Sequence, residues 1–323
     1  MAGFMDQNTQ FLLRTQLWSR HIKELLLDEL NAMKWVRLIQ DFPDGVLINI
    51  PSIGEAETAD FTEGQAIKYN AMATGNFTFQ FDNYKYSANS ISEKFKRDSF
   101  YAADVIAAFV PRQHRALMEA VETNILSKGN SAQTASNPNI INLADHRWVG
   151  TGANSAIAYP DFARAHYALT KANVPLTNLV AIVDPSVAYT IQTQANLVNL
   201  LSPMPMWENV VKDGAVTGFK FRFNLFGFDI YVSNYLPSIA SETITTGGVA
   251  NSVTNGVANY FFSAAPGDTL PWVGAFRQLP TVYSEFNKDL QQEEYLTIAE
   301  WGFKLYRPEN FICILTNTSV VPS

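Results

Sequence analysis

The chain has 323 residues, more than one average domain, which predicts one or two domains sharing a sizeable core. Apolar residues make up 47% and charged residues only 16%, a low charge density that indicates a surface largely covered by other chains. The formal net charge of −7 argues against a protein that grips nucleic acid by its phosphates, because such contacts need clustered Lys and Arg.

The N-terminal segment is predicted to be a long amphipathic helix from Thr9 to Arg37 that ends before Pro43 and Gly45. Its apolar residues recur at spacings of three or four: Trp18, Ile22, Leu26, Leu30 and Met33. We expect this helix to pack on its own core or on a neighbouring subunit. Because no signal peptide and no membrane-spanning apolar run are recognised, we also expect an intracellular protein.

Residues 46–92 are predicted to form an extended hairpin, because two β-type runs flank an acidic middle that contains glycine. In the second run Phe77, Phe79 and Phe81 alternate with polar residues, so one face of the hairpin must be covered. The nearby sequence offers no obvious local core for that face. Two coverings remain open, an adjacent subunit or the hairpin's own domain.

A helical section follows over residues 98–128. Because proline suits the first turn of a helix and not its middle, Pro111 predicts a short helix, a break or kink, and a second helix from Pro111 onward. Gly129 is predicted to lie just beyond the end of that second helix. The apolar stripe of the second helix consists of Leu117, Val121 and Ile125.

Further along, the pattern predicts a helix over 159–172, a strand over 178–183 and a second helix from Pro185. Asp184 stands where an N-cap belongs, and we favour capping over catalysis for it. The stretch "SETITTGGVANSVTNGVAN" predicts an exposed loop or a ragged hairpin. The tail predicts strands over 281–286, 294–306 and 310–317, with "RPEN" as the turn between the last two.

The stretch Gly218–Pro237 carries an amphipathic pattern that changes phase at Gly227. The inward residues are predicted to be Phe219, Phe221 and Phe223 before this glycine, and Phe228, Ile230 and Val232 after it. We therefore predict a bulge or tight bend at Gly227, since glycine tolerates the backbone geometry that lets a strand exchange its buried face.

No catalytic, metal or cofactor motif is recognised in the sequence. The four histidines lie in unrelated contexts, and there is no GxSxG elbow and no phosphate-binding loop. The single cysteine, Cys313, allows no intrachain disulfide and is predicted to be a buried apolar residue. The segment "HRWVG" has the composition of a binding site, but a packed corner is favoured.

Four carboxylates cluster in the middle of the hairpin: Glu55, Glu57, Asp60 and Glu63. A hydrolase with paired carboxylates is one interpretation of this cluster. The favoured interpretation is an exposed hairpin tip, where few apolar neighbours are present to push two pKa values apart. An enzyme is therefore the minority hypothesis.

The order of these parts resembles the major capsid proteins of tailed double-stranded DNA bacteriophages, which have the Hong Kong 97 type fold. "ADFTEGQAI" resembles the family's E-loop, and "ALMEAVETNILSKGN" resembles the end of its spine helix. "NLVAIVDPSVAYTI" and "LFGFDIYVSNYLP" resemble A-domain segments, and "AEWGFKLYRPENFICIL" resembles the closing strands. The resemblance covers nearly the whole chain from residue 46, and order and spacing carry it.

The resemblance implies an α+β, Hong Kong 97-like capsid fold. Its parts are an N-terminal arm (1–45), an E-loop hairpin (46–92), a P-domain with the spine helix (93–165), an A-domain (166–275) and return strands to the P-domain (276–323). It implies a structural protein without enzymatic activity that forms the pentamers and hexamers of an icosahedral virion capsid, assembled in the host cytoplasm around double-stranded DNA. Scaffolding, portal and decoration proteins are the partners it suggests, and no cofactor, membrane or sequence-specific DNA contact is expected. An encapsulin-like compartment is the alternative, and a soluble hydrolase comes third.

The resemblance also suggests which charges meet between subunits, because the family's E-loop lies across the adjacent subunit near its spine helix. The acidic candidates are Glu55, Glu57, Asp60 and Glu63. The basic candidates are Lys94, Lys96, Arg97, Arg112 and Arg115, and Lys220 and Arg222 are expected to face a neighbour from the A-domain.

Overall fold

The computed structural model describes most of the chain. The described residues are 30–40, 45, 47–54, 58, 60–61, 63–66, 74–98, 102–131, 139–193 and 221–317. For 102–109, 130–131, 192–193 and 221–225 only the backbone is described. Most of the predicted N-terminal helix, up to residue 29, lies outside the described residues.

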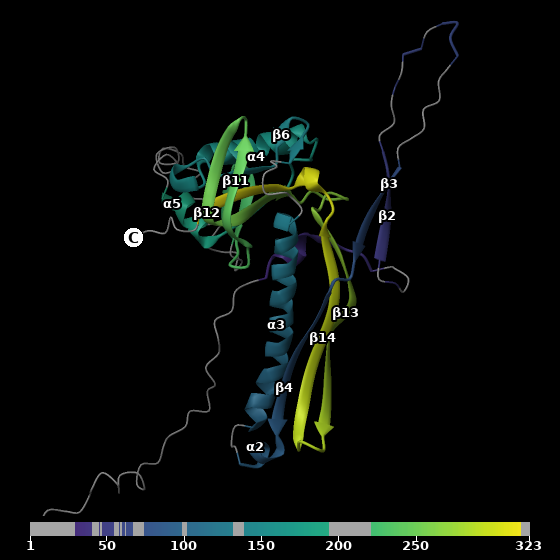
Figure 1. The fold of residues 1–323 in the computed structure, drawn as a ribbon, viewed down its shortest axis with the longest axis vertical. Helices are drawn as coiled ribbons and strands as arrows, with labels where there is room; N and C mark the ends of the chain where they lie inside the picture. Colours follow the sequence, from purple (N-terminus) through teal and green to yellow (C-terminus); the bar gives the residue numbers. More distant parts are fainter. Residues whose placement is uncertain are drawn as a thin grey trace, which may run out of the picture.

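Two sheets form the framework of the described chain (Figure 1). The four-stranded sheet has the order β1-β13-β14-β4, made of Val36–Leu38, Trp272–Asn287, Gln292–Leu305 and Asn83–Ser92. The seven-stranded sheet has the order β7-β15-β12-β8-β10-β9, with β11 paired to β12. Its strands are β7 (Arg147–Val149), β8 (Leu179–Val183), β9 (Phe221–Leu225), β10 (Phe228–Val232), β11 (Ser238–Thr246), β12 (Val249–Ser263) and β15 (Ile312–Asn317).

The long helix α3 (Ala102–Ser131) packs along the four-stranded sheet. Its predicted apolar stripe is confirmed, since Leu117, Val121 and Ile125 are at most 3% exposed. Gln113 fixes the helix to β14, because its side-chain amide accepts from Thr297 Oγ1 at 2.8 Å and donates to a backbone carbonyl at 3.1 Å. At about 1.5 Å per residue, a helix of this length spans roughly 45 Å.

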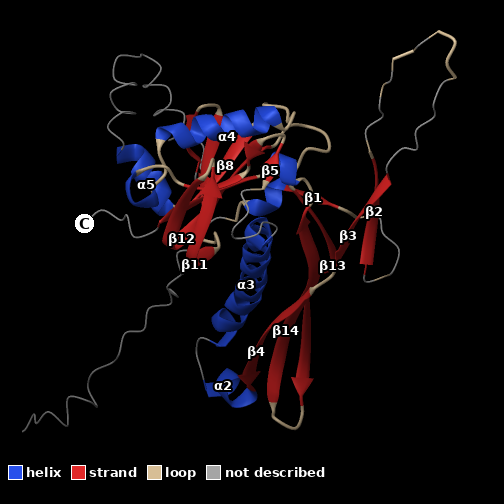
Figure 2. Cartoon of the chain, turned by 45° about the horizontal axis from the view of Figure 1, so that its top comes forward, coloured by secondary structure: helices blue, strands red, loops and turns tan. Residues whose placement is uncertain are grey.

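The seven-stranded sheet is covered on both faces. Alternate residues of a strand point to opposite faces, so Ala181 of β8 packs with α4 (Tyr159–Lys171) and α5 (Pro185–Thr193), while Ile182 joins the core beneath α3. Figure 2 shows α4 lying across this sheet. The predicted order of helix, strand and helix is therefore confirmed. The core that contains Ile182 also contains Trp301 of β14, so it joins the two sheets.

A separate two-stranded ribbon is formed by β2 (Leu47–Ile53) and β3 (Thr74–Gln80), which confirms the predicted hairpin over these residues. The prediction was wrong for 83–92, because β4 pairs with β14 and belongs to the four-stranded sheet. The alternating phenylalanines are covered within the chain: Phe79 and Phe81 pack on Val273 and Ala275 of β13. The base of the ribbon thus has a local core, supplied by a strand about 190 residues away.

The predicted helix at the N-terminus was wrong for its last residues. Ala32–Trp35 form a 3-10 turn, and β1 (Val36–Leu38) pairs in parallel with β13. The Trp35 ring packs edge-on at 4.9 Å from Tyr231 and 5.7 Å from Phe262, centroid to centroid. This tertiary packing outweighs the helical periodicity, which is only a weak local preference.

A break or a kink is predicted at Pro111, and the break is wrong. A short helix α2 (Glu93–Asp98) precedes α3, and α3 runs through Pro111 without interruption. Pro111 is exposed, and it removes one backbone hydrogen bond from the helix. Gly129 is not beyond the helix but inside it, where a Cβ would lie 2.6 Å from the Phe311 ring. This glycine permits close packing and does not end the helix.

Gly227 lies in a tight turn between two strands and not in a bulge of one strand. Phe226 and Gly227 have φ values of 53° and 81°, and they link the antiparallel strands β9 and β10. The phase of the apolar pattern changes because the chain reverses there. After the turn, Phe228, Ile230 and Val232 are buried as predicted. Before it, Phe219 lies outside the described residues, and for Phe221 and Phe223 only the backbone is described.

Several local predictions are confirmed. Asp184 caps α5, since its carboxylate accepts the backbone N–H of Ser186 at 2.9 Å. Cys313 is fully buried, and burial raises the pKa of its thiol to about 11. The stretch that was predicted to be a loop or hairpin is a regular hairpin of β11 and β12, and "RPEN" contains a 3-10 turn over Pro308–Asn310.

The "HRWVG" segment is a packed corner. Trp148 is buried and donates its indole N–H to Asp161 at 3.1 Å. Arg147, 1% exposed, forms a bidentate ion pair with Glu242 of β11, at 2.8 and 2.7 Å from one guanidinium nitrogen. The remaining short elements are β5 (Ile140–Ile141), β6 (Ala144–Asp145) and η2 (Ala153–Ser155).

Candidate assembly surfaces

The far end of the ribbon presents acidic and aromatic side chains to solvent. Asp60 and Glu63 are exposed, as predicted for a hairpin tip, and Phe61 between them is 75% exposed. Glu55 and Glu57 lie outside the described residues. The described tip thus combines an exposed phenyl ring with two exposed carboxylates.

The basic candidates near α2 are partly engaged within the chain. Lys96 forms an ion pair with Glu293 of β14, and the hydrogen bonds from Lys96 and Tyr295 lower the pKa of Glu293. Arg97 faces Glu93 one turn away at 3.6 Å and remains 76% exposed. Lys96 therefore holds α2 against the sheet, while Arg97 stays accessible.

The other basic candidates also differ in whether they are paired within the chain. Arg115 is paired with Glu119 at 2.9 Å, whereas Arg112 and Lys94 are exposed, and no ion pair between described residues engages either of them. Lys220 lies outside the described residues, and for Arg222 of β9 only the backbone is described. Arg97, Arg112 and Lys94 are thus the predicted cations that are most available to another chain.

Among the described residues, the structure does not bring the acidic and basic candidates together. In Figure 1 the ribbon stands to the right of the upper end of α3, whereas α2 lies at the lower end of the molecule.

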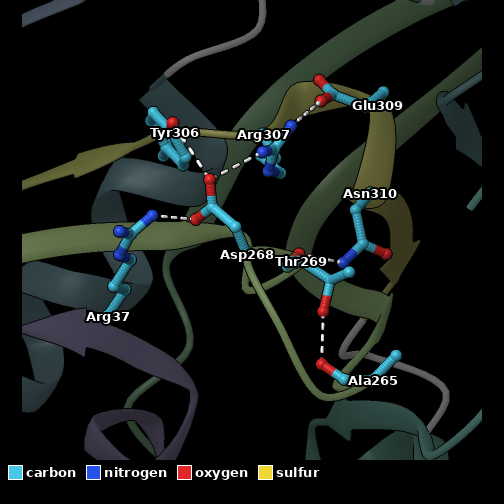
Figure 3. A network of polar contacts seen from close by, with 8 residues as sticks. All are labelled: Arg37, Ala265, Asp268, Thr269, Tyr306, Arg307, Glu309 and Asn310. Atoms are coloured by element: carbon cyan, nitrogen blue, oxygen red, sulfur yellow. Dashed lines mark hydrogen bonds and ion pairs between the residues drawn. The ribbon is translucent and has the colours of Figure 1, made fainter. Parts of the chain in front are cut away.

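A polar network at the junction of the two sheets was not predicted (Figure 3). Asp268, in the loop between β12 and β13, accepts hydrogen bonds from Arg37 of β1 and from Arg307, the latter at 2.8 Å. Tyr306 Oη donates to the same carboxylate at 3.4 Å, and Arg307 also pairs with Glu309 at 3.1 Å. The network ties the first described strand to the residues just before the 3-10 turn Pro308–Asn310.

The charge balance of this network favours the ionised form of Asp268. Burial raises the pKa of its carboxyl, but the hydrogen bonds from Arg307 and Arg37 outweigh burial and hold the pKa below its usual value. The sequence gives no signal for this cluster, because Asp268 lies 231 residues after Arg37 and 39 residues before Arg307, and "PGD" indicates only a turn.

A buried carboxylate on α3 anchors the chain where its described part begins. Glu122 is 1% exposed and accepts the backbone N–H groups of Asn31 and Ala32 at 2.9 Å. Burial raises the pKa of Glu122 despite these hydrogen bonds. A sequence signal exists here, because Glu122 stands beside Val121 and four residues before Leu126, on the apolar side of the helix.

A groove of 540 Å³ lies between the base of the ribbon and the ends of α3 and β14. Its apolar wall includes Phe79, Phe303 and Leu305. Lys128 and Lys304 are at its polar rim.

In the described part of the chain, no three or more His, Cys, Asp or Glu side chains are grouped so that they could hold a metal ion. None of the helices described is long and apolar enough to cross a membrane.

The whole chain is similar in fold to solved capsid structures. Cyanophage Pam1 capsid protein is 12% identical, with a TM-score of 0.70 over 99% of this chain and 100% of that one. A chain of Mycobacterium phage Che8 is 16% identical, with a TM-score of 0.64 over 93% and 96%. The capsid of cyanophage P-SCSP1u is also 16% identical, with a TM-score of 0.65 over 94% and 93%. These likenesses confirm the Hong Kong 97-like fold.

Sequence comparison assigns the family. A comparison with curated protein sequences finds no match. A sequence model of the phage capsid protein family matches residues 85–312, well over half of the chain, from β4 to the start of β15. The match contains α3, most strands of both sheets and the junction residues Asp268, Tyr306, Arg307 and Glu309, but not β1 with Arg37. With this match over a fold shared with phage capsids, the chain belongs to the phage capsid protein family.

Proposed function

We propose that this chain is the repeating subunit of an icosahedral shell, in which copies form pentamers and hexamers around double-stranded DNA. The family match over residues 85–312 is the observation that carries the proposal. The ribbon supports it, because a β-ribbon with an exposed apolar tip gains stability only when another surface covers it. An encapsulin-like compartment is not favoured, because the family that matches is that of phage capsid proteins.

The contacts in such a shell would be heterologous, with the ribbon of one copy on a different surface of the next. Heterologous contacts close into rings when the rotation between neighbours allows it. Many weak contacts then hold the shell together through multivalency. A net charge of −7 suits this role, because a strongly basic inner wall would retain packaged DNA.

We further propose that the acidic tip of the ribbon meets basic side chains near α2 and α3 of a neighbouring copy. Asp60 and Glu63 supply the described acids, and Lys94, Arg97 and Arg112 the most accessible cations. Each exposed pair contributes only about 0–1 kcal/mol and is screened by salt. Repeated around a ring, these pairs would set orientation and register more than affinity.

We infer that the shell is the virion capsid, assembled in the host cytoplasm with scaffolding, portal and decoration proteins as partners, and that the subunit binds DNA without sequence preference. We retain as a proposal the division into an arm (1–45), E-loop, P-domain (93–165 with 276–323) and A-domain (166–275). The expected E-loop range of 46–92 is shortened to end before β4, because β4 belongs to the four-stranded sheet. A structural role without a catalytic step fits the phage capsid family.

Sedimentation velocity of the purified protein over a range of concentrations tests the proposal. We expect species much larger than the 36.0 kDa subunit, of ring or shell size, either alone or with a co-expressed scaffold. A compact monomer at every concentration, in both conditions, would contradict it.

A further inference from the structure

His146 carries a fully buried imidazole ring. The residue is 0% exposed, and Nδ1 lies 3.1 Å from the carbonyl oxygen of Ala144. Because a carbonyl oxygen only accepts hydrogen bonds, the proton of the neutral ring is on Nδ1. Nε2 is also buried and makes no hydrogen bond of normal geometry with the described residues. A buried nitrogen without a partner is rare in a folded protein and calls for a reason.

The ring lies at a seam between two parts of the fold. One side of the seam is the corner segment, residues 139–149, which contains β5, β6 and β7. The other side consists of η3 (Pro308–Asn310) and β15, which pairs in parallel with β7. The backbone of Glu309 faces the ring, and the amide of Cys313 donates to the carbonyl of His146 at 2.9 Å. His146 therefore stands where the corner segment meets both η3 and β15.

The charged side chains next to the ring are each already in an ion pair. These pairs are Asp145 with Arg164 of α4 at 2.5 Å, Glu309 with Arg307 at 3.1 Å, and Arg147 of β7 with Glu242 at 2.7 Å. The thiol of Cys313 on β15 is uncharged, because burial raises its pKa to about 11. Among these described groups, no carboxylate is left over to neutralise a positive imidazole.

A second proton on His146 would place a positive charge in a site shielded from solvent. Burial lowers the pKa of His146, and it outweighs the backbone of Ala144 and Glu309 and the charges of Asp145 and Glu309, which raise it. Once the ring is exposed to solvent, its pKa returns to about 6.5. Because the closed state binds the proton less readily than the open state, the stability of the closed state is complete above about pH 6.5 and is lost as pH falls below it.

We propose that His146 is an acid-sensitive switch, which opens the seam between the corner segment and η3 when the imidazole takes up a second proton. The closed seam keeps the ring neutral, and in the open seam water solvates the imidazolium. Opening also displaces Glu309, which pairs with Arg307 of the junction network, and so weakens the tie between the two sheets. The inference goes beyond the proposed function and does not depend on it, because it concerns the single subunit.

The single cysteine of the chain reports on the seam. Cys313 is fully buried, and its Sγ accepts a hydrogen bond from Arg147 of the corner segment at 3.2 Å. The thiol can therefore react only after this segment moves away. The probe is dithiodipyridine at low concentration, because this reagent also reacts with thiols in mild acid. The labelling rate of the folded subunit, divided by that of the urea-unfolded chain at the same pH, gives the fraction of open molecules.

We expect the open fraction to rise about five- to tenfold between pH 7.5 and pH 5.5, because the exposed ring takes up its proton over this range. His146→Asn should abolish the rise, since its amide can donate to Ala144 as Nδ1 does and cannot be protonated. His166→Asn is the matched control. His166 is a partly exposed histidine on α4, so this variant should behave as the parent does.

Two outcomes of the labelling experiment would overturn the inference. One is an open fraction that does not change with pH in the parent, or that rises equally in the parent and in His146→Asn. The other is a labelling rate that equals, at both pH values, the rate expected from global unfolding in urea. That result would show that no separate seam opens before the subunit unfolds.

Hydrogen exchange of the parent gives an answer that does not depend on a variant that folds. The amide of Cys313 is bonded to the carbonyl of His146, so its protection should fall about five- to tenfold between pH 7.5 and pH 5.5, after correction for the intrinsic exchange rate. The amides of Val121 and Leu126 in the buried part of α3 should keep their protection. An equal fall in both regions, or none at Cys313, would overturn the inference.

Discussion

The carboxylate of Glu122 on α3 holds the backbone amide of Ala32 between its two oxygens, at 2.9 and 3.0 Å. The amide of Asn31 binds the same carboxylate at 2.9 Å, and all three residues are buried. One side chain of the long helix therefore satisfies the first backbone donors of the described chain. It fixes Asn31 and Ala32, near the start of the described chain, to the long helix.

Replacing Glu122 by alanine should lower the free energy of unfolding by about 1–3 kcal/mol, because two buried N–H groups lose their acceptor. Glu119→Ala is the matched control on the same helix. Glu119 is partly exposed and paired with Arg115, so its loss should cost less than about 1 kcal/mol. Denaturant unfolding of the free subunit measures both, and equal losses would contradict the anchoring role of Glu122.

Removing residues 1–29 should leave a folded subunit with a near-parent unfolding midpoint, because the residues of the described core begin at Asn31. Removing residues 1–38 should strongly destabilise the subunit. That deletion takes away Trp35, which packs on Phe262, and β1, which pairs with β13. Thermal unfolding compares the two truncations. Similar midpoints would show that β1 and η1 (Ala32–Trp35) are dispensable for the core.

The junction network should make the stability of the folded subunit depend on pH in the acid range. The hydrogen bonds from Arg307 and Arg37 hold the pKa of Asp268 low, so the contribution is complete above the unfolded value of about 3.9 and is lost as pH falls through the lower folded pKa. Asp268→Asn should therefore narrow the difference between stability at pH 7 and at pH 3. The effect should stay below about 1 kcal/mol and weaken in salt, since the side chains are partly exposed.

The contribution of Glu122 to stability changes with pH in the opposite direction over the same acid range. Its raised pKa means that the folded state binds a proton more readily than the unfolded chain, so this contribution grows as pH falls. The contribution of Glu122 cancels when the parent is compared with Asp268→Asn, because both proteins contain Glu122. Parallel stability curves for these two proteins between pH 7 and pH 3 would contradict the role of Asp268.

Charge reversal tests the proposed contacts near α2. Glu57→Lys with Glu63→Lys should impair assembly at low salt and leave the unfolding of the free subunit nearly unchanged. Lys94→Glu with Arg97→Glu in the same chain should partly restore assembly. Lys96 is excluded from the rescue, because its pair with Glu293 holds α2 on the sheet. Light scattering at low salt measures assembly, and equal yields for the acid-reversed variant and the parent would contradict these contacts.

Elements whose residues pack locally were predictable from the sequence. Three such predictions were confirmed: the apolar stripe of Leu117, Val121 and Ile125, the cap at Asp184 and the buried strand before it. Apolar periodicity and capping both depend on residues that are close in the sequence. Prediction failed where a distant strand decides the outcome. Val36 pairs with Trp272, and β4 pairs with β14, both across more than 190 residues.

The candidate surfaces could likewise be predicted only where their residues are close in the sequence. The acidic tip could be recognised because Asp60 and Glu63 are close in the sequence and no apolar run adjoins them. The groove, the Asp268 network and the pairing of Lys96 could not, because each combines side chains from elements far apart in the chain. Exposure of Phe61 is likewise a property of the fold and not of its local pattern.

Electron microscopy of the purified, concentrated protein tests the central claim most directly. The account predicts closed particles of uniform size with five- and six-fold clusters of subunits, formed by the chain alone or with a co-expressed scaffold. A field of monomers or irregular aggregates under both conditions, from protein that unfolds cooperatively, would contradict it.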